Sequence, residues 1–442
     1  MKIPAALITI AMCACLFCCC GGVALADTEG PDGRTPPARQ LLVMLRLPTA
    51  HFRSDGNYGN GWDAQLGRHA RRRVAEALAS DLQLRVGAEW SMTSLGLDCF
   101  VMELPSGADA PALQRALERR PEVESVEPMH EYHALEAVRT GRGLQAPDSH
   151  DDPLYALQPT ARRWHLAELH AVSTGRGVTV AVIDSGVDSA HIELHGHVAV
   201  NRDFVATGSV PAEDHGTAVA GIIAAIPDNH LGIAGVAPAV RLLALRACGQ
   251  AGEADATVTR CNSFALAKAL QTALDERADV INLSLAGPDD RLLARLIDVA
   301  LARGACVVAA ADPHAAGGSF PASHAGVVAV RGEDQTVPPT ALPAPGQDIP
   351  TTLPGERWGF VSGSSFAAAE VSGLVALLRE LERAGPQADA WWSSGAAAPG
   401  SARRTEGKLL DPCALAAALV HNCVCACADH VDNALPHDFS RN

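Results

Sequence analysis

The sequence predicts an α/β fold, in which a parallel sheet is flanked by helices on both faces and is preceded by a small α+β domain of the ferredoxin type. Two observations support this prediction. From residue 153 onward, short apolar runs alternate with helix-like stretches, as is typical of a parallel sheet buried on both faces. Before residue 134, two helical patterns interleave with strand patterns. A chain of 442 residues is long enough for one large and one small domain.

The chain begins with an apolar leader. Residues 1–26 hold one lysine and an apolar run that ends in small residues, a pattern typical of a signal peptide cleaved after Ala26. A membrane-spanning helix is the alternative, although the run is short and is interrupted by Gly21 and Gly22. Lipid attachment at Cys15 is disfavoured because the preceding residues fit a lipobox poorly. We therefore expect a secreted or periplasmic protein with no stable membrane span after signal removal.

The small domain is expected over residues 41–133. Residues 27–40, rich in Pro, Gly and charge, predict a disordered lead before it. Residues 134–152 are polar, contain Gly and Pro, and predict an exposed linker after it. The strand patterns of the domain are LLVMLRL, LDCFVMEL and VESVEPM, and its helical patterns are RHARRRVAEALASDLQL and APALQRALERR.

The large domain is expected over residues 153–420, followed by a cysteine-containing tail at 421–442. Its buried-strand patterns are VTVAVI, LLALRAC, DVINLSL, ACVVAAA and GVVAVRG. Helical spacing marks SFALAKALQTALDER and RLLARLIDVALARG between them.

Charge and cysteine content limit the function classes. A net charge of -15 and 4% aromatic residues provide no basic surface for phosphate backbones, which excludes nucleic acid as an expected partner. In an oxidising compartment, Cys248 and Cys261 are expected to form a disulfide that closes a surface loop. Four cysteines near the carboxyl terminus are expected to pair among themselves, with metal binding as the disfavoured alternative. These four are Cys413, Cys423, Cys425 and Cys427.

Three short patterns contain the residues for a nucleophilic mechanism. VAVIDSGVD places Asp184 at the end of a predicted buried strand, where open α/β sheets build their sites. DHGTAVAGIIAA places His215, and SGSSFAAAEVSG places Ser365, at predicted helix starts. A serine hydroxyl needs a base such as imidazole to take its proton, and a carboxylate can hold the other ring nitrogen. Ser364 is interpreted as a capping or packing neighbour.

The blocks VAVIDSGVDSAHIEL, HGTAVAGIIAA, LGIAGVAP, VINLSL and GSSFAAAEVSG, in this order, resemble the subtilisin-like serine peptidases, or peptidase S8 family. The resemblance implies a serine endopeptidase that acts through an acyl-enzyme. It assigns the catalytic roles to Asp184, His215 and Ser365, and polypeptides as substrates. The domain ending in VESVEPMHEY resembles the inhibitory propeptide of this family, which aids folding and is cut off afterwards. The chain itself would then be the first partner of its active site.

The resemblance also implies a substrate-binding segment. Backbone groups of this segment would pair with a substrate strand, which requires little side-chain bulk in the way. An ordinary loop after a strand is the alternative. The segment consists of Ser284, Leu285, Ala286 and Gly287.

The sequence departs from the family at the oxyanion site. The family has an asparagine in an AAGN block, whereas this chain reads VVAAADPHAAGG, with Asp312 as the candidate at that position. Loss of one oxyanion donor costs ~10²- to 10³-fold in turnover. Two negative charges about 4 Å apart repel by roughly 4 kcal/mol at an effective dielectric constant of about 20. The rival hypothesis is therefore a catalytically impaired pseudopeptidase that binds peptides or proteins without efficient turnover.

Other departures concern packing and metal binding. Ala218, Ala369 and Glu370 replace residues that are usual around the histidine and serine blocks, and are expected to alter stability. No cofactor is required for the mechanism. A structural calcium ion is a further possibility implied by the resemblance, because oxygen ligands suit calcium, with ordinary surface polarity as the alternative. The candidate ligands are Gln158, Glu193 and Asn229.

Overall fold

The computed structural model describes residues 37–46, 60–135, 137–139, 150–251, 258–315, 319–336 and 338–384. The predicted signal peptide, most of the lead, the carboxyl-terminal tail and its four cysteines lie outside these residues. Among the described residues, no helix combines the length and apolar character needed to cross a bilayer.

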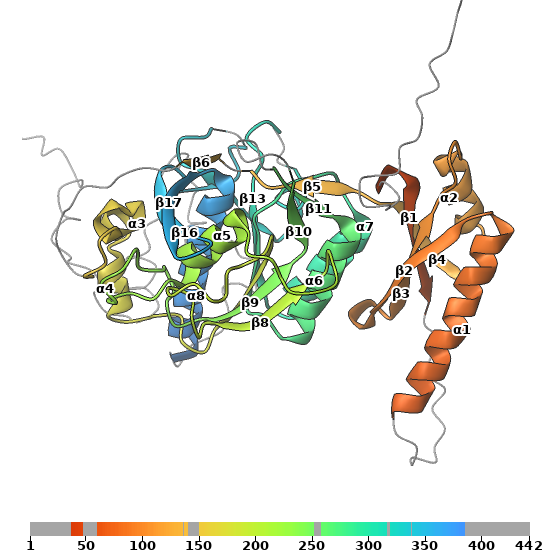
Figure 1. The fold of residues 1–442 in the computed structure, drawn as a ribbon, viewed down its shortest axis with the longest axis horizontal. Helices are drawn as coiled ribbons and strands as arrows, with labels where there is room; N and C mark the ends of the chain where they lie inside the picture. Colours follow the sequence, from red (N-terminus) through yellow and green to blue (C-terminus); the bar gives the residue numbers. More distant parts are fainter. Residues whose placement is uncertain are drawn as a thin grey trace, which may run out of the picture. The chain divides into compact units, whose positions relative to one another are not determined.

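The amino-terminal unit, residues 37–135, contains a four-stranded antiparallel sheet with strand order β2-β3-β1-β4 (Figure 1). Its elements follow in the order strand, helix, two strands, helix, strand, which is the ferredoxin-like arrangement. They are η1 (Pro37–Arg39), β1 (Gln40–Arg46), α1 (Asn60–Asp81), β2 (Arg85–Met92), η2 (Thr93–Leu95), β3 (Leu97–Glu103), α2 (Ala110–Glu118) and β4 (Val123–Pro128).

Local chemistry explains these elements. In β1, Leu41 and Val43 face a core shared with Leu78 of α1, as expected for a strand whose side chains alternate between two faces. The Asp109 carboxylate caps α2 by accepting a hydrogen bond from the Ala112 N–H at 3.0 Å. Because β1 begins at Gln40, the last residue of the predicted lead belongs to the sheet.

The large unit, residues 150–384, contains a seven-stranded sheet with the order β15-β14-β13-β12-β7-β9-β8, in which every neighbouring pair is parallel. The strands are β7 (Thr179–Asp184), β8 (Val198–Asp203), β9 (Arg241–Arg246), β12 (Val280–Leu283), β13 (Cys306–Ala310), β14 (Val328–Gly332) and β15 (Leu342–Ala344).

Helices cover both faces of this sheet (Figure 1). Val180 and Val182 of β7 pack in one core with α5 and α8, whereas Ala181 and Ile183 pack in a second core with α6 and α7. This confirms the predicted parallel sheet flanked on both faces. The helices are η3 (Tyr155–Leu157), α3 (Pro159–Arg163), α4 (Leu166–His170), α5 (Asp214–Ala224), α6 (Ser263–Asp275), α7 (Arg291–Ala302) and α8 (Ser364–Ala384).

Two small antiparallel sheets join segments that are distant in sequence. One has the order β10-β11-β5 and the other β16-β17-β6. Their strands are β5 (Glu131–His133), β6 (Ala137–Arg139), β10 (Cys248–Ala251), β11 (Val258–Asn262), β16 (Ile349–Leu353) and β17 (Arg357–Ser362).

These sheets contain the predicted disulfide and part of the segment between the two units. Cys248 of β10 lies directly opposite Cys261 of β11, and the two form the predicted disulfide. The segment expected as an exposed linker includes β6, which pairs with β17 through backbone hydrogen bonds. Polar composition does not reveal such pairing, since an edge strand needs only its backbone to dock.

Candidate active site

The three predicted catalytic residues lie at the carboxyl end of the large sheet, where parallel sheets build their sites. Asp184 is the last residue of β7, and His215 and Ser365 are the second residues of α5 and α8. Asp184 is 2% exposed, and His215 and Ser365 are fully buried. The structure therefore collects the three predicted residues at one edge of the sheet.

Asp184 holds the imidazole of His215. The distance from Asp184 Oδ1 to His215 Nδ1 is 2.6 Å, and the same oxygen accepts a hydrogen bond from the Ser185 N–H. A Cβ at Gly216 would lie 2.3 Å from the Ser185 carbonyl oxygen, so glycine permits this close approach. With Nδ1 engaged by a carboxylate, Nε2 is the nitrogen that can take a proton from a hydroxyl.

Ser365 lies among backbone groups. Its Oγ donates a hydrogen bond to the Ser284 carbonyl at 3.0 Å and accepts one from the Leu135 N–H at 3.1 Å. In return, the Ser284 hydroxyl donates to the Ser365 carbonyl at 2.8 Å. The neighbouring Ser364 hydroxyl is buried and has no hydrogen-bond partner among the described residues. The two adjacent serines thus occupy different environments.

Asn282 supports this arrangement and was not singled out from the sequence. Its side-chain amide donates to Ser284 Oγ at 2.9 Å, and its carbonyl oxygen accepts from Ser372 Oγ at 2.9 Å. Asn282 is fully buried in β12. A polar side chain inside the apolar run VINLSL was the available signal, because buried amides need partners.

The predicted substrate-binding segment pairs with another strand of this chain. The His133 N–H donates to the Ala286 carbonyl at 3.0 Å, and the Ala286 N–H donates to the His133 carbonyl at 2.9 Å. Gly287 pairs on with Phe320, to whose carbonyl its N–H donates. The backbone of this segment therefore accepts an antiparallel strand, as β-augmentation requires.

Asp312 lies two residues beyond the end of β13. Its side chain is partly buried, and its carboxylate accepts a hydrogen bond from the His314 N–H at 2.8 Å. The Ala315 N–H donates to the Asp312 carbonyl in the same turn. The carboxylate is thus held by its own loop.

A buried charge network lies beside His215. The guanidinium of Arg246 makes two hydrogen bonds of 2.8 and 2.9 Å to the Glu213 carboxylate and also bonds Asp203. Glu213 accepts further from the backbone N–H groups of Gly186 and Gln250. Burial would raise the pKa of Glu213, but these hydrogen bonds, first that from Arg246, leave the pKa lowered.

This network positions the start of α5, since Glu213 is the residue before that helix. Sequence reasoning missed Glu213 and Arg246. A charged residue inside the apolar run LLALRAC was the only signal for Arg246, and a buried arginine requires an acidic partner.

The predicted calcium ligands are engaged with N–H donors. The amide of Gln158 exchanges two hydrogen bonds with the backbone of Ala234. Glu193 accepts from the side chains of Asn229 and Trp358, both at 3.1 Å. Burial raises the pKa of Glu193 to about 7. Calcium requires converging oxygen atoms without intervening donors, so these residues, as arranged, do not fit the ion. The calcium site stays a prediction.

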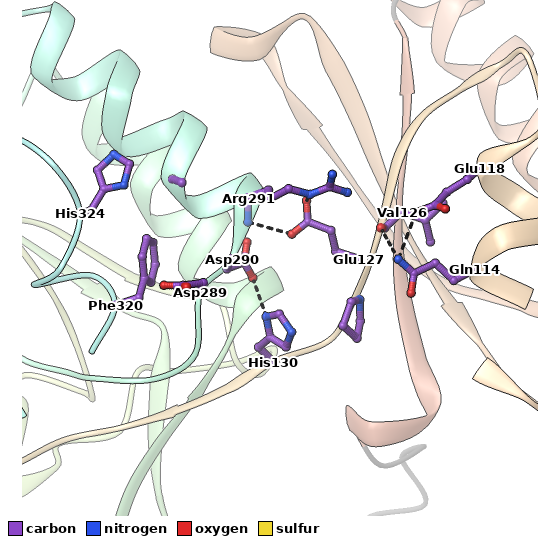
Figure 2. Close-up of a pocket in the computed structure, with 12 residues that line it drawn as sticks. Gln114, Glu118, Val126, Glu127, His130, Asp289, Asp290, Arg291, Phe320 and His324 are labelled. Atoms are coloured by element: carbon purple, nitrogen blue, oxygen red, sulfur yellow. Dashed lines mark hydrogen bonds and ion pairs between the residues drawn. The ribbon is translucent and has the colours of Figure 1, made fainter. Parts of the chain in front are cut away.

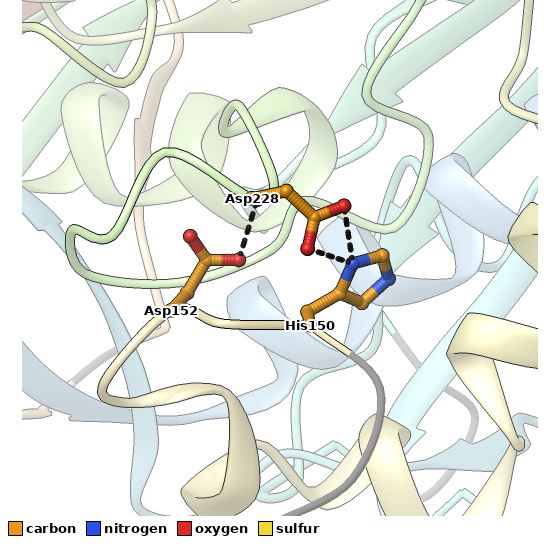
Figure 3. A group of neighbouring side chains, drawn as sticks. All are labelled: His150, Asp152 and Asp228. Atoms are coloured by element: carbon orange, nitrogen blue, oxygen red, sulfur yellow. Dashed lines mark hydrogen bonds and ion pairs between the residues drawn. The ribbon is translucent and has the colours of Figure 1, made fainter.

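A second polar cluster lies at the start of the large unit, formed by His150, Asp152 and Asp228 (Figure 3). His150 Nδ1 is 3.0 Å from both carboxylate oxygens of Asp228, and its Nε2 is 3.0 Å from Nδ1 of His170. Asp152 accepts a hydrogen bond from the Asp228 N–H at 3.0 Å. These contacts fasten the first residues of the unit to the loop after α5.

Comparisons with known proteins identify a family for this chain. The subtilase family matches residues 175–421. A thermophilic serine proteinase from Bacillus sp. (strain AK1) is 40% identical over 216 residues, which cover 46% of this chain and 52% of that protein. Thermitase from Thermoactinomyces vulgaris is 34% identical over 228 residues, or 49% of this chain and 77% of thermitase.

Among solved structures, fervidolysin from Fervidobacterium pennivorans, described as a keratinolytic enzyme related to subtilisin, aligns with a TM-score of 0.58. The alignment covers 79% of this chain and 55% of fervidolysin at 20% identity, and it supports the fold. The family match spans more than half of the full chain of 442 residues. This chain therefore belongs to the subtilase family of serine peptidases.

Proposed function

We propose that this protein is an exported serine endopeptidase, made as a precursor, that hydrolyses peptide bonds through Asp184, His215 and Ser365. The observation that carries the proposal is the 2.6 Å contact between Asp184 and His215 at the sheet edge that also holds Ser365. Membership of the subtilase family supports it.

The mechanism follows from the residues present. Ser365 Oγ would attack the substrate carbonyl while His215 Nε2 takes its proton, and Asp184 would stabilise the resulting imidazolium. The backbone of Ser284 to Gly287 would hold the substrate strand in register. The Ser365 N–H, at the start of α8, would donate to the oxyanion.

The amino-terminal unit would act as an inhibitory propeptide and folding aid. This is supported by the contact of Leu135 with Ser365 Oγ, which places a segment of the chain across the proposed nucleophile. The signal-like residues 1–26 support export.

Labelling with a fluorophosphonate probe tests the nucleophile, because adjacent Ser364 supplies a matched control. We expect Ser364→Ala to be labelled and Ser365→Ala to remain unlabelled and unprocessed. Equal labelling of both variants, or none of the unchanged protein, would contradict the proposal.

The pseudopeptidase is the second candidate, and Asp312 favours it, since a carboxylate stands at the position expected for an oxyanion donor. On this reading, the unchanged protein binds peptides without turnover, and Asp312→Asn creates activity. Activity of the unchanged protein would rule out this reading.

A further inference from the structure

Two imidazole rings lie against each other at the start of the large unit. His150 Nε2 is 3.0 Å from Nδ1 of His170, which is the last residue of α4. The two ring centroids are 5.1 Å apart, and the ring planes are inclined by 58°. Asp228, which bonds His150, follows the carboxyl end of α5, whereas His215 lies in the first turn of that helix. The pair is therefore joined to the opposite end of α5 from the proposed catalytic histidine.

The nitrogen of His150 that faces away from His170 must carry a hydrogen. This nitrogen, Nδ1, lies 3.0 Å from both carboxylate oxygens of Asp228 (Figure 3). A carboxylate accepts hydrogen bonds and cannot donate them, so the hydrogen of this contact is on Nδ1. Asp228 also accepts from the Asp151 N–H at 3.2 Å, which holds the carboxylate in place. In the neutral ring, Nε2 is then the nitrogen that has a bare lone pair.

The nitrogen of His170 that faces away from His150 must carry a hydrogen as well. This nitrogen, Nε2, lies 3.0 Å from the backbone carbonyl oxygen of Val236, which can only accept. Nδ1, which faces His150, is then the bare nitrogen of the neutral ring. Two lone pairs therefore face each other across 3.0 Å. They repel unless a cation, either a proton or a metal ion, lies at them.

Another histidine, His130, shows the ordinary arrangement. Its Nδ1 lies 3.4 Å from Asp290 Oδ2 (Figure 2). In such a contact the ring hydrogen points at an acceptor, and no further cation is required. His150 and His170 differ from His130 because each directs its ring hydrogen to a group outside the pair.

The surroundings of the two rings are those of metal ligands. A histidine that binds zinc generally gives its other N–H to a carboxylate or a backbone carbonyl, which fixes the ring, and this pair has one partner of each kind. The side chain of His150 is 8% exposed, and its ring packs edge-on against Tyr155. Two nitrogens at ~2.0–2.1 Å from a tetrahedral zinc ion lie roughly 3.3 Å apart. The rings would need to separate by only about 0.3 Å to reach that spacing.

We propose that His150 Nε2 and His170 Nδ1 bind a transition-metal ion that prefers imidazole, such as Zn²⁺. The Asp228 carboxylate and the Val236 carbonyl orient the two rings, and water completes the coordination of the ion. The ion joins the first described residue of the large unit to α4 and to the loop after α5. This inference goes beyond the proposed peptidase function and does not depend on it.

The proposed ion differs in chemistry from the predicted calcium ion. Calcium takes oxygen ligands, whereas neutral imidazole suits zinc, copper and nickel. The two rings supply nitrogen atoms alone, and neither histidine is among the candidate calcium ligands. The two sites can therefore be told apart by the metal that each one binds.

Calorimetric titration of Zn²⁺ into the full chain tests the site, with Ser365→Ala in every sample to prevent processing. His150→Phe keeps an aromatic ring, and His170→Gln keeps an amide that can donate a hydrogen bond. Each should bind one zinc ion fewer than the Ser365→Ala reference. His230→Ala is the matched control, because the His230 side chain is 83% exposed in the same loop as the carboxylate of the site. This control should bind as many zinc ions as the reference. Equal numbers of zinc ions in all four chains would overturn the proposal.

Calcium competition and an outer-shell variant provide a second test. Ca²⁺ should not displace the zinc, because it prefers oxygen ligands. Displacement would assign the ion to the carboxylates of Asp152 and Asp228 and would overturn the proposal. Asp228→Gly, which suits the φ of 58° at this position, should weaken zinc binding by ~10- to 100-fold. An affinity unchanged by this substitution would contradict the assigned orientation of the rings.

Because a variant can fail to fold, anomalous X-ray scattering from zinc-soaked crystals of the Ser365→Ala chain locates the ion without changing the pair. We expect a zinc peak within bonding distance of both His150 Nε2 and His170 Nδ1. A peak on the carboxylates alone, or no peak at the pair, would overturn the proposal and show that the two nitrogens share a proton instead.

Discussion

Two buried glutamates, one just before a helix and one inside the neighbouring helix, show how differently this protein treats a carboxylate. Glu213 precedes α5, which contains His215, and Glu370 lies in α8, which contains Ser365. Arg246 and two backbone N–H groups surround Glu213, and its pKa is lowered. Neither oxygen of Glu370 has a partner among the described residues, and burial raises its pKa well above the ordinary value.

The comparison teaches that hydrogen-bond and charge partners, more than the degree of burial, decide the direction in which the pKa of a buried acid shifts. Glu213 is 9% exposed and Glu370 fully buried, yet the pKa of the first is lowered and that of the second is raised. The paired acid fixes the start of the histidine helix. The acid without a partner among the described residues makes the stability of the serine helix depend on pH.

Replacing Arg246, the cation that pairs with Glu213, should have the largest effect on the unfolding free energy. Arg246→Met leaves Glu213 and Asp203 buried without their counter-charge, which is expected to cost about 3–5 kcal/mol of unfolding free energy. Denaturant unfolding measures it. The triple variant with Glu213→Gln and Asp203→Asn is the control and should recover most of the loss. A single variant within about 1 kcal/mol of the unchanged protein would contradict this account.

Replacing Glu370, whose carboxyl group has no partner among the described residues, should alter the pH dependence of the unfolding free energy. The folded protein holds the Glu370 proton more tightly than the unfolded chain, so stability falls as pH rises above the unfolded pKa of 4.5, by about 1.4 kcal/mol per unit. Glu370→Gln removes this slope. The unfolding free energy of the variant, measured relative to the unchanged protein, should therefore grow between pH 5 and 7. A constant difference across that range would show that Glu370 titrates normally.

A partly buried histidine, His170, extends the comparison because its pKa shifts in the opposite direction to that of Glu370. Burial lowers the pKa of His170 to about 4, although its hydrogen bond to the Val236 carbonyl opposes the shift. The stabilising contribution is complete above the unfolded pKa of 6.5 and is lost as pH falls toward 4. After allowance for partial exposure, we expect a loss of about 2 kcal/mol. In His170→Gln, the glutamine amide can bond the same groups but does not titrate. Thermal unfolding at several pH values should therefore show no loss of stability from this position as the pH falls. The same loss of stability in the variant would refute this role of His170.

Glu193 is intermediate between Glu213 and Glu370, because burial raises its pKa while hydrogen-bond donors oppose the shift. Removing one of these donors should have the smallest effect on the unfolding free energy. Burial raises its pKa to about 7, while donors including the Trp358 indole oppose the shift. Trp358→Phe removes one donor to the carboxylate and should cost about 1 kcal/mol at pH 8. At pH 5, where Glu193 is protonated, the cost should be smaller. Denaturant unfolding at the two pH values measures it, and equal costs would show that packing of the indole dominates.

Much of the fold could be predicted because periodicity and burial are local properties. ACVVAAA is apolar at every position and VTVAVI at every position but Thr179, which favours strands covered on both sides, and both became central strands of the parallel sheet. The pairing of Cys248 with Cys261 followed from their spacing and the expected oxidising compartment. The pairing of β6 could not be predicted, because this strand docks by its backbone and leaves no apolar pattern in the sequence.

The sequence by itself determined which residues stand at the ends of the sheet strands. Asp184 ends an apolar strand, and His215 and Ser365 lie in the first turns of small-residue helices, which are positions at the carboxyl edge of a parallel sheet. Their roles remain the subject of the labelling experiment.

Only the tertiary structure decided what surrounds them. Arg246 lies 33 positions from Glu213 in sequence, and Leu135 lies 230 positions from Ser365, so no local pattern could show either contact. The register of the segment that ends at Leu135 depends on hydrogen bonds from two separate strands. The physical reason is that backbone pairing and buried ion pairs join groups regardless of their separation along the chain, whereas sequence patterns report only the immediate neighbourhood of each residue.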